Sequence, residues 1–316
     1  MVKHTGDLLV LCVAMLASIA ILSKGAMAED QSKGPIFLNI DHASICGSNL
    51  DSLRQAFTSV GLGSDYGGPH ANGVTHMALL GFENGSYLEL IAPQNAGKVA
   101  GSGWSNLMAG DAGPCAWAIS SQDIGEDVAR LKAAGVPVSG PEDGSRKRPD
   151  GMSVEWQTAN LGSGAPGTTL PFLIQDRTPR AWRVQPTESL KDSGLTGFAM
   201  IVVGVRDLNA ASALFEKAFN WQPPVIEEHG DFDAKLAYFP GMHVILATPL
   251  RAGRGWLAER LQKFGDSPAA FLLSARDFSA VSKKFHLSGN KTWFQQQVSW
   301  FDEHKLNGWR IGVVGQ

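Results

Sequence analysis

"IDHASICGSNLDSLRQAFTSVG", residues 40–61, predicts a β-strand that leads directly into an α-helix. The β-branched and apolar residues at its start are typical of a strand. Asn49 is a residue type favoured at helix N-caps, the apolar residues that follow have helical spacing, and Gly61 suits the residue after a helix.

The same strand-helix plan occurs three more times along the chain, so the fold is built from repeats. In each case an aspartate takes the N-cap position. The further repeats are residues 115–135 with Asp123, residues 198–219 with Asp207, and residues 269–289 with Asp277.

Short strands separated by turn residues follow each helix, which predicts a βαβββ module. One helix covers only one face of such a module, so the other face needs a second module. We therefore expect an α+β fold of four modules, paired into two domains whose curved mixed sheets each enclose a cup. The first domain spans residues 36–178, the linker residues 179–194, and the second domain residues 195–316.

The overall charge argues against a nucleic-acid partner. The formal net charge is −3, and only 18% of the 316 residues are charged. Such a chain has no basic field to attract a phosphate backbone. Phosphate-binding loops, dinucleotide fingerprints and His-Glu-x-x-His motifs are also absent from the sequence. We expect a small molecule as the partner.

The N-terminus has the pattern of a secretory signal peptide. Lys3 precedes an apolar run from Leu8 to Leu22, and Ala26-Met27-Ala28 has the small-x-small spacing of a cleavage site. We expect cleavage after Ala28 and a secreted or periplasmic protein without membrane contact. The alternative is an uncleaved membrane anchor, although the run is shorter than the about 20 residues that usually span a bilayer.

Two cysteines remain after signal removal, Cys46 and Cys115. Export would permit a disulfide. The alignment of the repeats, however, places the two residues on opposite faces of their strands, so we expect two free, buried thiols.

A histidine and a glutamate interrupt the apolar hairpin "GVTHMALLGFENGSYLELIAP", residues 73–93. With Asn84-Gly85 as a two-residue turn, Leu80 pairs with Glu89, and His76 and Glu89 share a face about 13 Å apart. A closer partner is His42, because the first and fourth strands of a βαβββ module run parallel and adjacent. We expect His42 and Glu89 side by side on the concave face.

These side chains predict a metal site. His42 and Glu89, completed by His76 or water, would suit Fe(II), Mn(II), Ni(II) or Zn(II). His76 and Glu89 are also the candidate catalytic groups, and His70 in the loop "GGPHANG" is a further candidate. The alternative is a hydrogen-bonded core histidine, but an unpaired glutamate in an apolar strand would be costly.

Four further residues are candidates for substrate binding. Arg146 and Arg148 precede a proline turn, where a guanidinium can clamp a substrate carboxylate. Trp117 and Trp156, in strands of the second module, are candidates for the pocket wall. The alternatives are solvated arginines and core tryptophans.

The "IDH" of the first strand and the "YLELIAP" of the fourth resemble the vicinal oxygen chelate superfamily, in its glyoxalase-like branch. "GGPHANGVTHMALLGF", "SRKRPDG" and "LPFLIQ" are similar to segments of that branch. The resemblance implies a divalent metal in the cup, chelated by substrate oxygens, with His42 and Glu89 at ligand positions. The superfamily includes lyases, isomerases, epimerases, extradiol dioxygenases and metal-free drug-binding proteins.

The other modules depart from this pattern. Counting back seven residues from each helix cap reaches His42, Ala116, Met200 and Ala270, and "HVILATP" places Ile245 opposite Glu89. Superfamily sites usually take metal ligands from both modules of a pair. In this chain Gln175 is the one candidate metal ligand in the second module. We expect the second domain to be structural or to shape the substrate site.

Three functions remain open at this point. The first is an exported, metal-dependent enzyme of lyase or isomerase type that acts on a small oxygen-rich substrate. The second is a metal-free protein that binds a small molecule in the same cup, and the third is an Fe(II) extradiol-type dioxygenase. A homodimer formed by exchange of modules is also left open.

Overall fold

The computed structural model describes residues 1–2, 34–95 and 103–315. The predicted signal peptide and its cleavage site lie outside these residues. Gly34 to the C-terminus forms one compact unit. Among the described residues, no helix has the length and apolar character needed to cross a membrane.

All four predicted helix caps are present. The side chains of Asn49, Asp123, Asp207 and Asp277 each accept a hydrogen bond from the backbone N–H three residues further on. These caps satisfy donors that the first turn of a helix leaves unpaired. The helices are α1 (Leu50–Ser59), α2 (Ser105–Ala109), α3 (Ile124–Ala133), α4 (Arg180–Arg183), α5 (Leu208–Phe219), α6 (Trp256–Phe264), α7 (Phe278–Lys284) and the 3₁₀ turn η1 (Glu188–Leu190).

The first two modules form one eight-stranded sheet with the order β2-β3-β4-β1-β5-β8-β7-β6. In this sheet β1 lies parallel to β4, and β5 lies parallel to β8, while β1 and β5 join the modules in antiparallel fashion. Its strands are β1 (Ile40–Cys46), β2 (Asp65–Pro69), β3 (Thr75–Gly81), β4 (Tyr87–Pro93), β5 (Gly113–Ser120), β6 (Val138–Lys147), β7 (Ser153–Leu161) and β8 (Phe172–Asp176).

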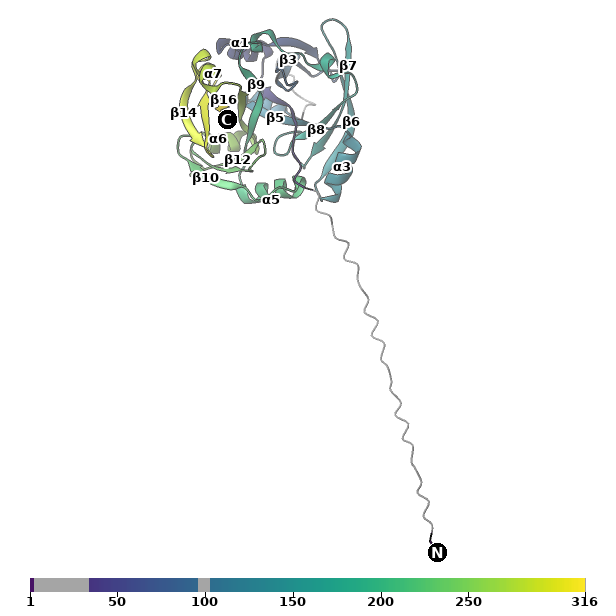
Figure 1. Cartoon of the computed structure of the whole chain (residues 1–316). Coiled ribbons are helices and arrows are strands. Elements are labelled where there is room, and N and C mark those ends of the chain that lie inside the picture. The colour runs from purple at the N-terminus through teal and green to yellow at the C-terminus, as the bar shows by residue number, and fades with distance from the viewer. Residues whose placement is uncertain (3–33, 96–102, 316) are drawn as a thin grey trace. The chain divides into compact units, whose positions relative to one another are not determined.

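The third and fourth modules form a second eight-stranded sheet with the equivalent order β10-β11-β12-β9-β13-β16-β15-β14. The predicted α+β fold of paired βαβββ modules is therefore confirmed (Figure 1). The strands are β9 (Leu195–Gly204), β10 (Val225–His229), β11 (Ala234–Tyr238), β12 (Val244–Pro249), β13 (Ser267–Ala275), β14 (Ser288–Trp293), β15 (Gln296–Trp300) and β16 (Arg310–Gly315).

The largest hydrophobic core contains residues of both sheets and of their helices. Trp117 on β5 belongs to this core, with 0% of its surface exposed, and stacks on Phe215 of α5 at a ring-centroid distance of 6.4 Å. The expectation that Trp117 lines a ligand pocket is therefore wrong.

The concave face of the second sheet is filled with apolar side chains. Met200 and Ile245, which occupy the positions of His42 and Glu89, pack there with Phe232 and Trp293 in a separate hydrophobic cluster. The charged groups of the first cup have no counterparts at these two positions.

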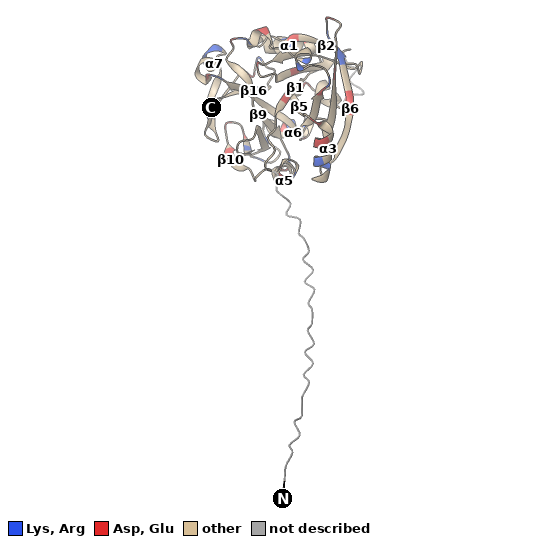
Figure 2. Cartoon of the chain, turned by 45° about the vertical axis from the view of Figure 1, so that its right-hand side comes forward, with Lys and Arg blue, Asp and Glu red and all other residues tan. Residues whose placement is uncertain are grey.

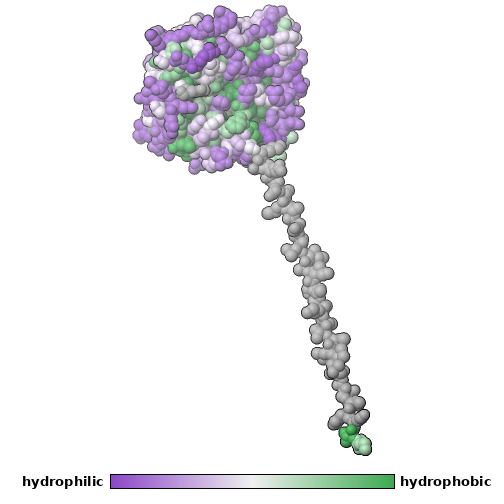
Figure 3. Space-filling view, viewed as in Figure 1, coloured by the Kyte–Doolittle hydropathy of each residue, from purple (hydrophilic) through white to green (hydrophobic). Residues whose placement is uncertain are grey.

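Charged residues of both signs are interspersed along the ribbon (Figure 2). On the face seen in Figure 1, hydrophobic residues show between hydrophilic ones toward the middle (Figure 3).

Candidate functional site

The first sheet encloses a cavity of about 640 Å³, a volume suited to a small molecule. The two edges of the sheet meet at one point, where His70 and Arg146 form an isolated antiparallel bridge. The Ala71 amide also donates to the Ser145 carbonyl at 3.0 Å. This contact closes the cup on one side and brings His70 to the cavity.

His42 and Glu89 lie together at the cavity, as predicted from the parallel pairing of β1 and β4. His42 Nε2 is 4.0 Å from Glu89 Oε2, and the two residues are only 3% and 6% exposed. Ser44, opposite Glu89 in the strand register, donates its hydroxyl to Glu89 Oε2 at 2.9 Å. One carboxylate oxygen is therefore fixed by the protein.

Asp41 orients the His42 ring. A β-bulge at Asp41 lets this residue and its neighbour His42 approach each other, and Asp41 Oδ1 lies 2.6 Å from His42 Nδ1. Burial alone would raise the pKa of the Asp41 carboxyl, but Arg183 and the hydrogen bond with His42 lower it below its usual value. Asp41 is therefore an anion that accepts the Nδ1–H and leaves Nε2 facing Glu89.

The cations that hold Asp41 come from the predicted linker. Arg183 donates to both Asp41 oxygens, at 2.9 and 2.8 Å, and to the Tyr87 hydroxyl at 2.9 Å. It also pairs with Asp176 at 2.5 Å, and Arg180 contacts the same two carboxylates. Burial beside these anions raises the pKa of Tyr87 despite the neighbouring Arg183. The segment after β8 is thus part of the site.

His70 is the second imidazole beside Glu89. Its Nε2 is 3.6 Å from Glu89 Oε1, and its Nδ1 is 2.8 Å from the Thr75 hydroxyl. Burial lowers the pKa of His70 more than the nearby Glu89 raises it, so His70 is neutral at pH 7. From the sequence, His70 is only a candidate in a loop. The bridge that brings it to the cavity joins β2 to β6 and is a tertiary contact, which the sequence does not reveal.

His76 does not face Glu89, so the predicted sharing of a site by these residues is wrong. The turn between β3 and β4 has three residues, with the Phe82 amide bonded to the Ser86 carbonyl and Gly85 at φ 84°. Glu89 therefore pairs with Leu79 rather than Leu80. A register shift of one residue moves a side chain to the other face of a strand. His76 lies outside the cavity lining and packs edge-on against Tyr66.

The predicted substrate arginines are engaged within the protein. Arg146 lines the cavity but is buried, and its terminal nitrogens donate to the Gly67 carbonyl at 2.6 Å and the Arg183 carbonyl at 2.5 Å. Arg148 lies outside this cavity and pairs with Asp150 at 2.9 Å. Gln175 does not line the cavity either. Its side chain donates a hydrogen bond to the Gln122 carbonyl and accepts one from the Ile124 amide.

Aromatic side chains form much of the cavity wall. Trp156, predicted for this role, lies there with its ring edge-on to His70. Trp104 and Phe172 are further wall residues, and the Trp104 indole N–H donates to the Pro166 carbonyl at 2.8 Å. These two residues were missed, because nothing in their local sequence distinguishes them from core aromatics.

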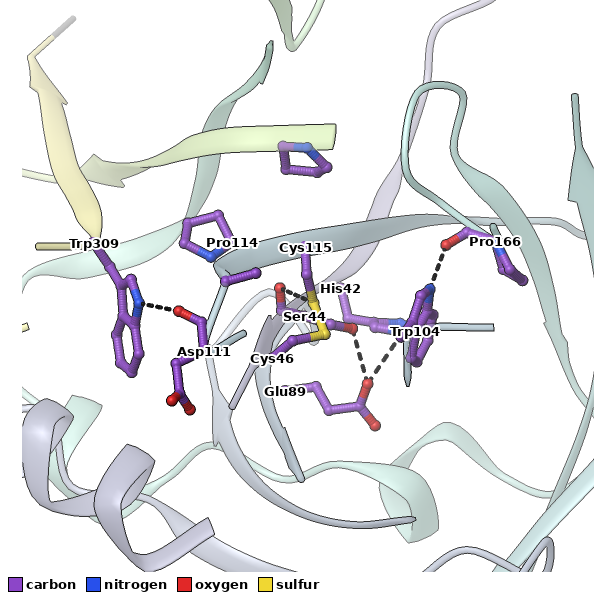
Figure 4. Close-up of a disulfide and its surroundings, with 12 residues drawn as sticks. His42, Ser44, Cys46, Glu89, Trp104, Asp111, Pro114, Cys115, Pro166 and Trp309 are labelled. Atoms are coloured by element: carbon purple, nitrogen blue, oxygen red, sulfur yellow. Dashed lines mark hydrogen bonds and ion pairs between the residues drawn. A yellow bond between two sulfur atoms is a disulfide. The ribbon is translucent and has the colours of Figure 1, made fainter. Parts of the chain in front are cut away.

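Cys46 and Cys115 form a disulfide, so the prediction of free thiols is wrong (Figure 4). Between the pairs Ser44–Ala116 and Ile45–Pro114 the register shifts by one residue, which leaves Cys115 in a bulge. The bulge reverses the facing of Cys115 and brings it to Cys46, with 5.8 Å between Cα atoms. The bridge lies beside Ser44, whose carbonyl is 3.2 Å from Cys115 Sγ.

The family model that describes a glyoxalase-like domain matches residues 40–219, more than half of the chain. The chain belongs to the glyoxalase-like domain family. The resemblance predicted from "IDH" and "YLELIAP" is thus confirmed. No curated protein matches this glyoxalase-like chain.

Solved structures support the fold. A hypothetical protein from Staphylococcus aureus is 16% identical, with a TM-score of 0.57, 88% of this chain covered and 99% of that one. A mutant of 4-hydroxymandelate synthase from Streptomyces coelicolor is 13% identical, with a TM-score of 0.56 and coverages of 89% and 92%. At these identities the likeness concerns the fold alone.

The superfamily resemblance implies a metal, and this glyoxalase-like site has part of a donor set for one. Two imidazoles direct Nε2 toward one carboxylate, and Asp41 supports one of them, as is common around metals. Among the described residues, however, no three His, Cys, Asp or Glu side chains are grouped closely enough to hold an ion. His76, the predicted third ligand, is on the other face. The residues do not fit a metal held by three protein ligands.

Proposed function

We propose that the cavity of the first sheet is the active site of an enzyme of lyase or isomerase type that removes a proton from a small molecule. His42, oriented by Asp41, and Glu89 are the bases. The observation that carries this proposal is the buried row Asp41, His42 and Glu89, with separations of 2.6 and 4.0 Å, of which His42 and Glu89 line the cavity.

His42 has the arrangement of a general base. In the neutral form of His42 that donates its Nδ1–H to Asp41, the lone pair is on Nε2, and His42 lines the cavity. A proton taken up at Nε2 makes an imidazolium, which the Asp41 anion stabilises without itself becoming protonated. Arg183 keeps Asp41 in the charged form that this role requires.

Glu89 supplies a second acceptor on the same side of the substrate. Ser44 holds its Oε2, while Oε1 faces His70. The proton balance is that of an isomerisation: one proton leaves a substrate atom, resides on His42 or Glu89, and returns to another atom of the same molecule. For a lyase the same base takes the proton as the leaving group departs.

The proposed reaction uses no metal step, because the donor set does not fit a three-ligand site. The oxygen-rich substrate predicted from the sequence depended on chelation by that metal, and it is not carried over. The Fe(II) dioxygenase loses its support for the same reason. A metal-free binding protein remains the alternative, favoured by the aromatic walls of the cavity.

We also propose that the protein is exported. The predicted signal peptide supports it, and so does the Cys46–Cys115 disulfide, since disulfides persist mainly in oxidising compartments.

Solvent deuterium exchange tests the proposed activity without a known substrate. A panel of small carbon acids is incubated in D₂O with the chain from Glu29, and proton loss is followed by NMR. We expect at least one compound to exchange faster with the protein, and Glu89→Gln and His42→Gln to slow that exchange by about 10²-fold or more.

His76→Gln is the matched control, because His76 belongs to the same hairpin but faces away from the cavity. An equal loss in His76→Gln, or an unchanged rate in Glu89→Gln, would contradict the proposal. A panel that binds without exchange would favour the binding protein. Near-stoichiometric metal by plasma mass spectrometry, lost in both His42→Ala and Glu89→Ala, would restore the metal-dependent enzyme.

A further inference from the structure

The charged groups at the cavity indicate which ligands it accepts. Both buried arginines are committed to protein acceptors, Arg146 to two carbonyls and Arg183 to Asp41, Asp176 and Tyr87. Neither guanidinium is free to bind a substrate carboxylate or phosphate. An anionic ligand would instead be repelled by the Glu89 carboxylate, which lines the cavity.

The polar atoms that face the cavity at Glu89 are acceptors. Three groups there can accept a hydrogen bond from a ligand. They are Glu89 Oε1, Nε2 of neutral His42 when its Nδ1–H is donated to Asp41, and Nε2 of neutral His70 when its Nδ1–H is donated to Thr75. His42 is 3% exposed, and its Nε2 has no hydrogen bond to any residue in the described ranges. The site therefore lacks hydrogen-bond donors, and a ligand can supply them.

The acceptors at Glu89 can surround an ammonium group once they move apart. Ligands at about 2.1 Å from one divalent ion lie about 3.0 to 3.4 Å apart. Acceptors at about 2.8 Å from an ammonium nitrogen lie about 4.6 Å apart. The observed separations, 3.6 and 4.0 Å, lie between these two values, so an ammonium nitrogen fits after the acceptors move apart by about 0.6 to 1.0 Å. The ammonium group is favoured by its three donors, which are what this set of acceptors needs.

The remainder of the cavity suits a flat apolar body and an approaching cation. Trp104, Trp156 and Phe172 line it, and aromatic faces attract cations as well as apolar groups. Glu142 and Asp143 on β6 are exposed lining residues, so they add negative potential at the opening.

We propose that the cavity recognises a primary amine on a flat, aromatic body, with the ammonium group between Glu89 and the two imidazoles and the ring between the tryptophans. This inference rests on the proposed function only in taking the same cavity as the ligand site. It makes no use of the proton-transfer step, so binding and turnover test the two separately.

Isothermal titration calorimetry with three indoles tests the inference, with EDTA present throughout. Tryptamine carries the ammonium group, tryptophol is its neutral counterpart and indole-3-acetate is the anion. We expect tryptamine to bind at least tenfold more tightly than tryptophol, and indole-3-acetate to bind more weakly than either. In Glu89→Gln the affinity for tryptamine should fall to that for tryptophol, while tryptophol itself changes less than threefold.

Two further variants keep the outcome decisive. His76→Gln should leave all three affinities unchanged, and Trp156→Ala should weaken tryptamine and tryptophol alike. Circular dichroism checks that each variant is folded. The inference is overturned if indole-3-acetate binds as tightly as tryptamine, if the preference for tryptamine persists in Glu89→Gln, or if none of the indoles binds. Loss of exchange activity with intact amine binding would reject the proposed reaction alone.

Discussion

Arg183, in the segment that joins the two sheets, donates to both carboxylate oxygens of Asp41 on the first strand of the fold. The two residues are 142 positions apart in sequence and both are buried. The Asp41 carboxylate, paired with Arg183, also accepts the hydrogen bond from His42 Nδ1–H. A residue outside both sheets therefore determines the charge behind the proposed base.

Arg183→Met should destabilise the protein strongly. The change leaves the buried Asp41 without its bidentate partner, and removal of one member of a buried ion pair costs about 3–5 kcal/mol. Urea unfolding followed by circular dichroism measures the loss. Arg180→Met is the control, because the Arg180 side chain is one-third exposed and should cost clearly less. Equal effects of the two changes would contradict a special role for Arg183.

Asp41→Asn should impair catalysis more than binding. An amide can present its N–H₂ to His42 Nδ1 and so favour the tautomer with the proton on Nε2, which cannot accept a proton there. We expect kcat for proton exchange to fall about 10²-fold or more, with KM changed only a few-fold. If kcat stays within threefold of the wild type, His42 does not act as a base oriented by Asp41.

His70 should make the stability depend on pH on the acidic side of neutrality. Its pKa in the folded protein is lowered, chiefly by burial, from an ordinary value of 6.5. Above pH 6.5 both the folded and unfolded forms are neutral, and as pH falls below that value the unfolded chain is protonated first. The stabilisation present above pH 6.5 is thus lost as pH falls through the lower, folded pKa.

His70→Gln is the variant that tests this dependence. Thermal or urea unfolding from pH 7.5 to 5 should show a shallower decline of stability in His70→Gln than in the wild type. The slope in a His304→Gln control should match the wild type, because His304 lies on an exposed turn. Parallel declines in the wild type and in His70→Gln would contradict the assignment.

The fold could be predicted because its signals are local. The caps at Asn49, Asp123, Asp207 and Asp277 repeat with the strand-helix pattern, and each satisfies amides in its own helix. The contact of His42 with Glu89 then follows from the parallel pairing that a βαβββ module requires.

The wrong predictions for His76 and for the cysteines have two physical causes, an added turn residue and a β-bulge. One additional residue in the turn at Gly85 turned His76 away from Glu89, and a bulge at Cys115 turned that residue toward Cys46. Neither feature has a clear sequence signal. Arg183 and His70 reach the site through tertiary contacts, which periodicity and spacing do not reveal.

The disulfide should contribute substantially to stability, because it closes a long segment of chain. Cys46 and Cys115 are 69 positions apart, and a loop of that size corresponds to about 4 kcal/mol in the chain-entropy description of the unfolded state. The double variant Cys46→Ala/Cys115→Ala should lose an amount of this order in urea unfolding. Alkylation of the unfolded, unreduced chain from Glu29 should label no thiol, whereas labelling of two thiols would show that the bridge does not form. Since the bridge lies beside Ser44, which holds Glu89, the folded double variant should also exchange protons more slowly than the wild type.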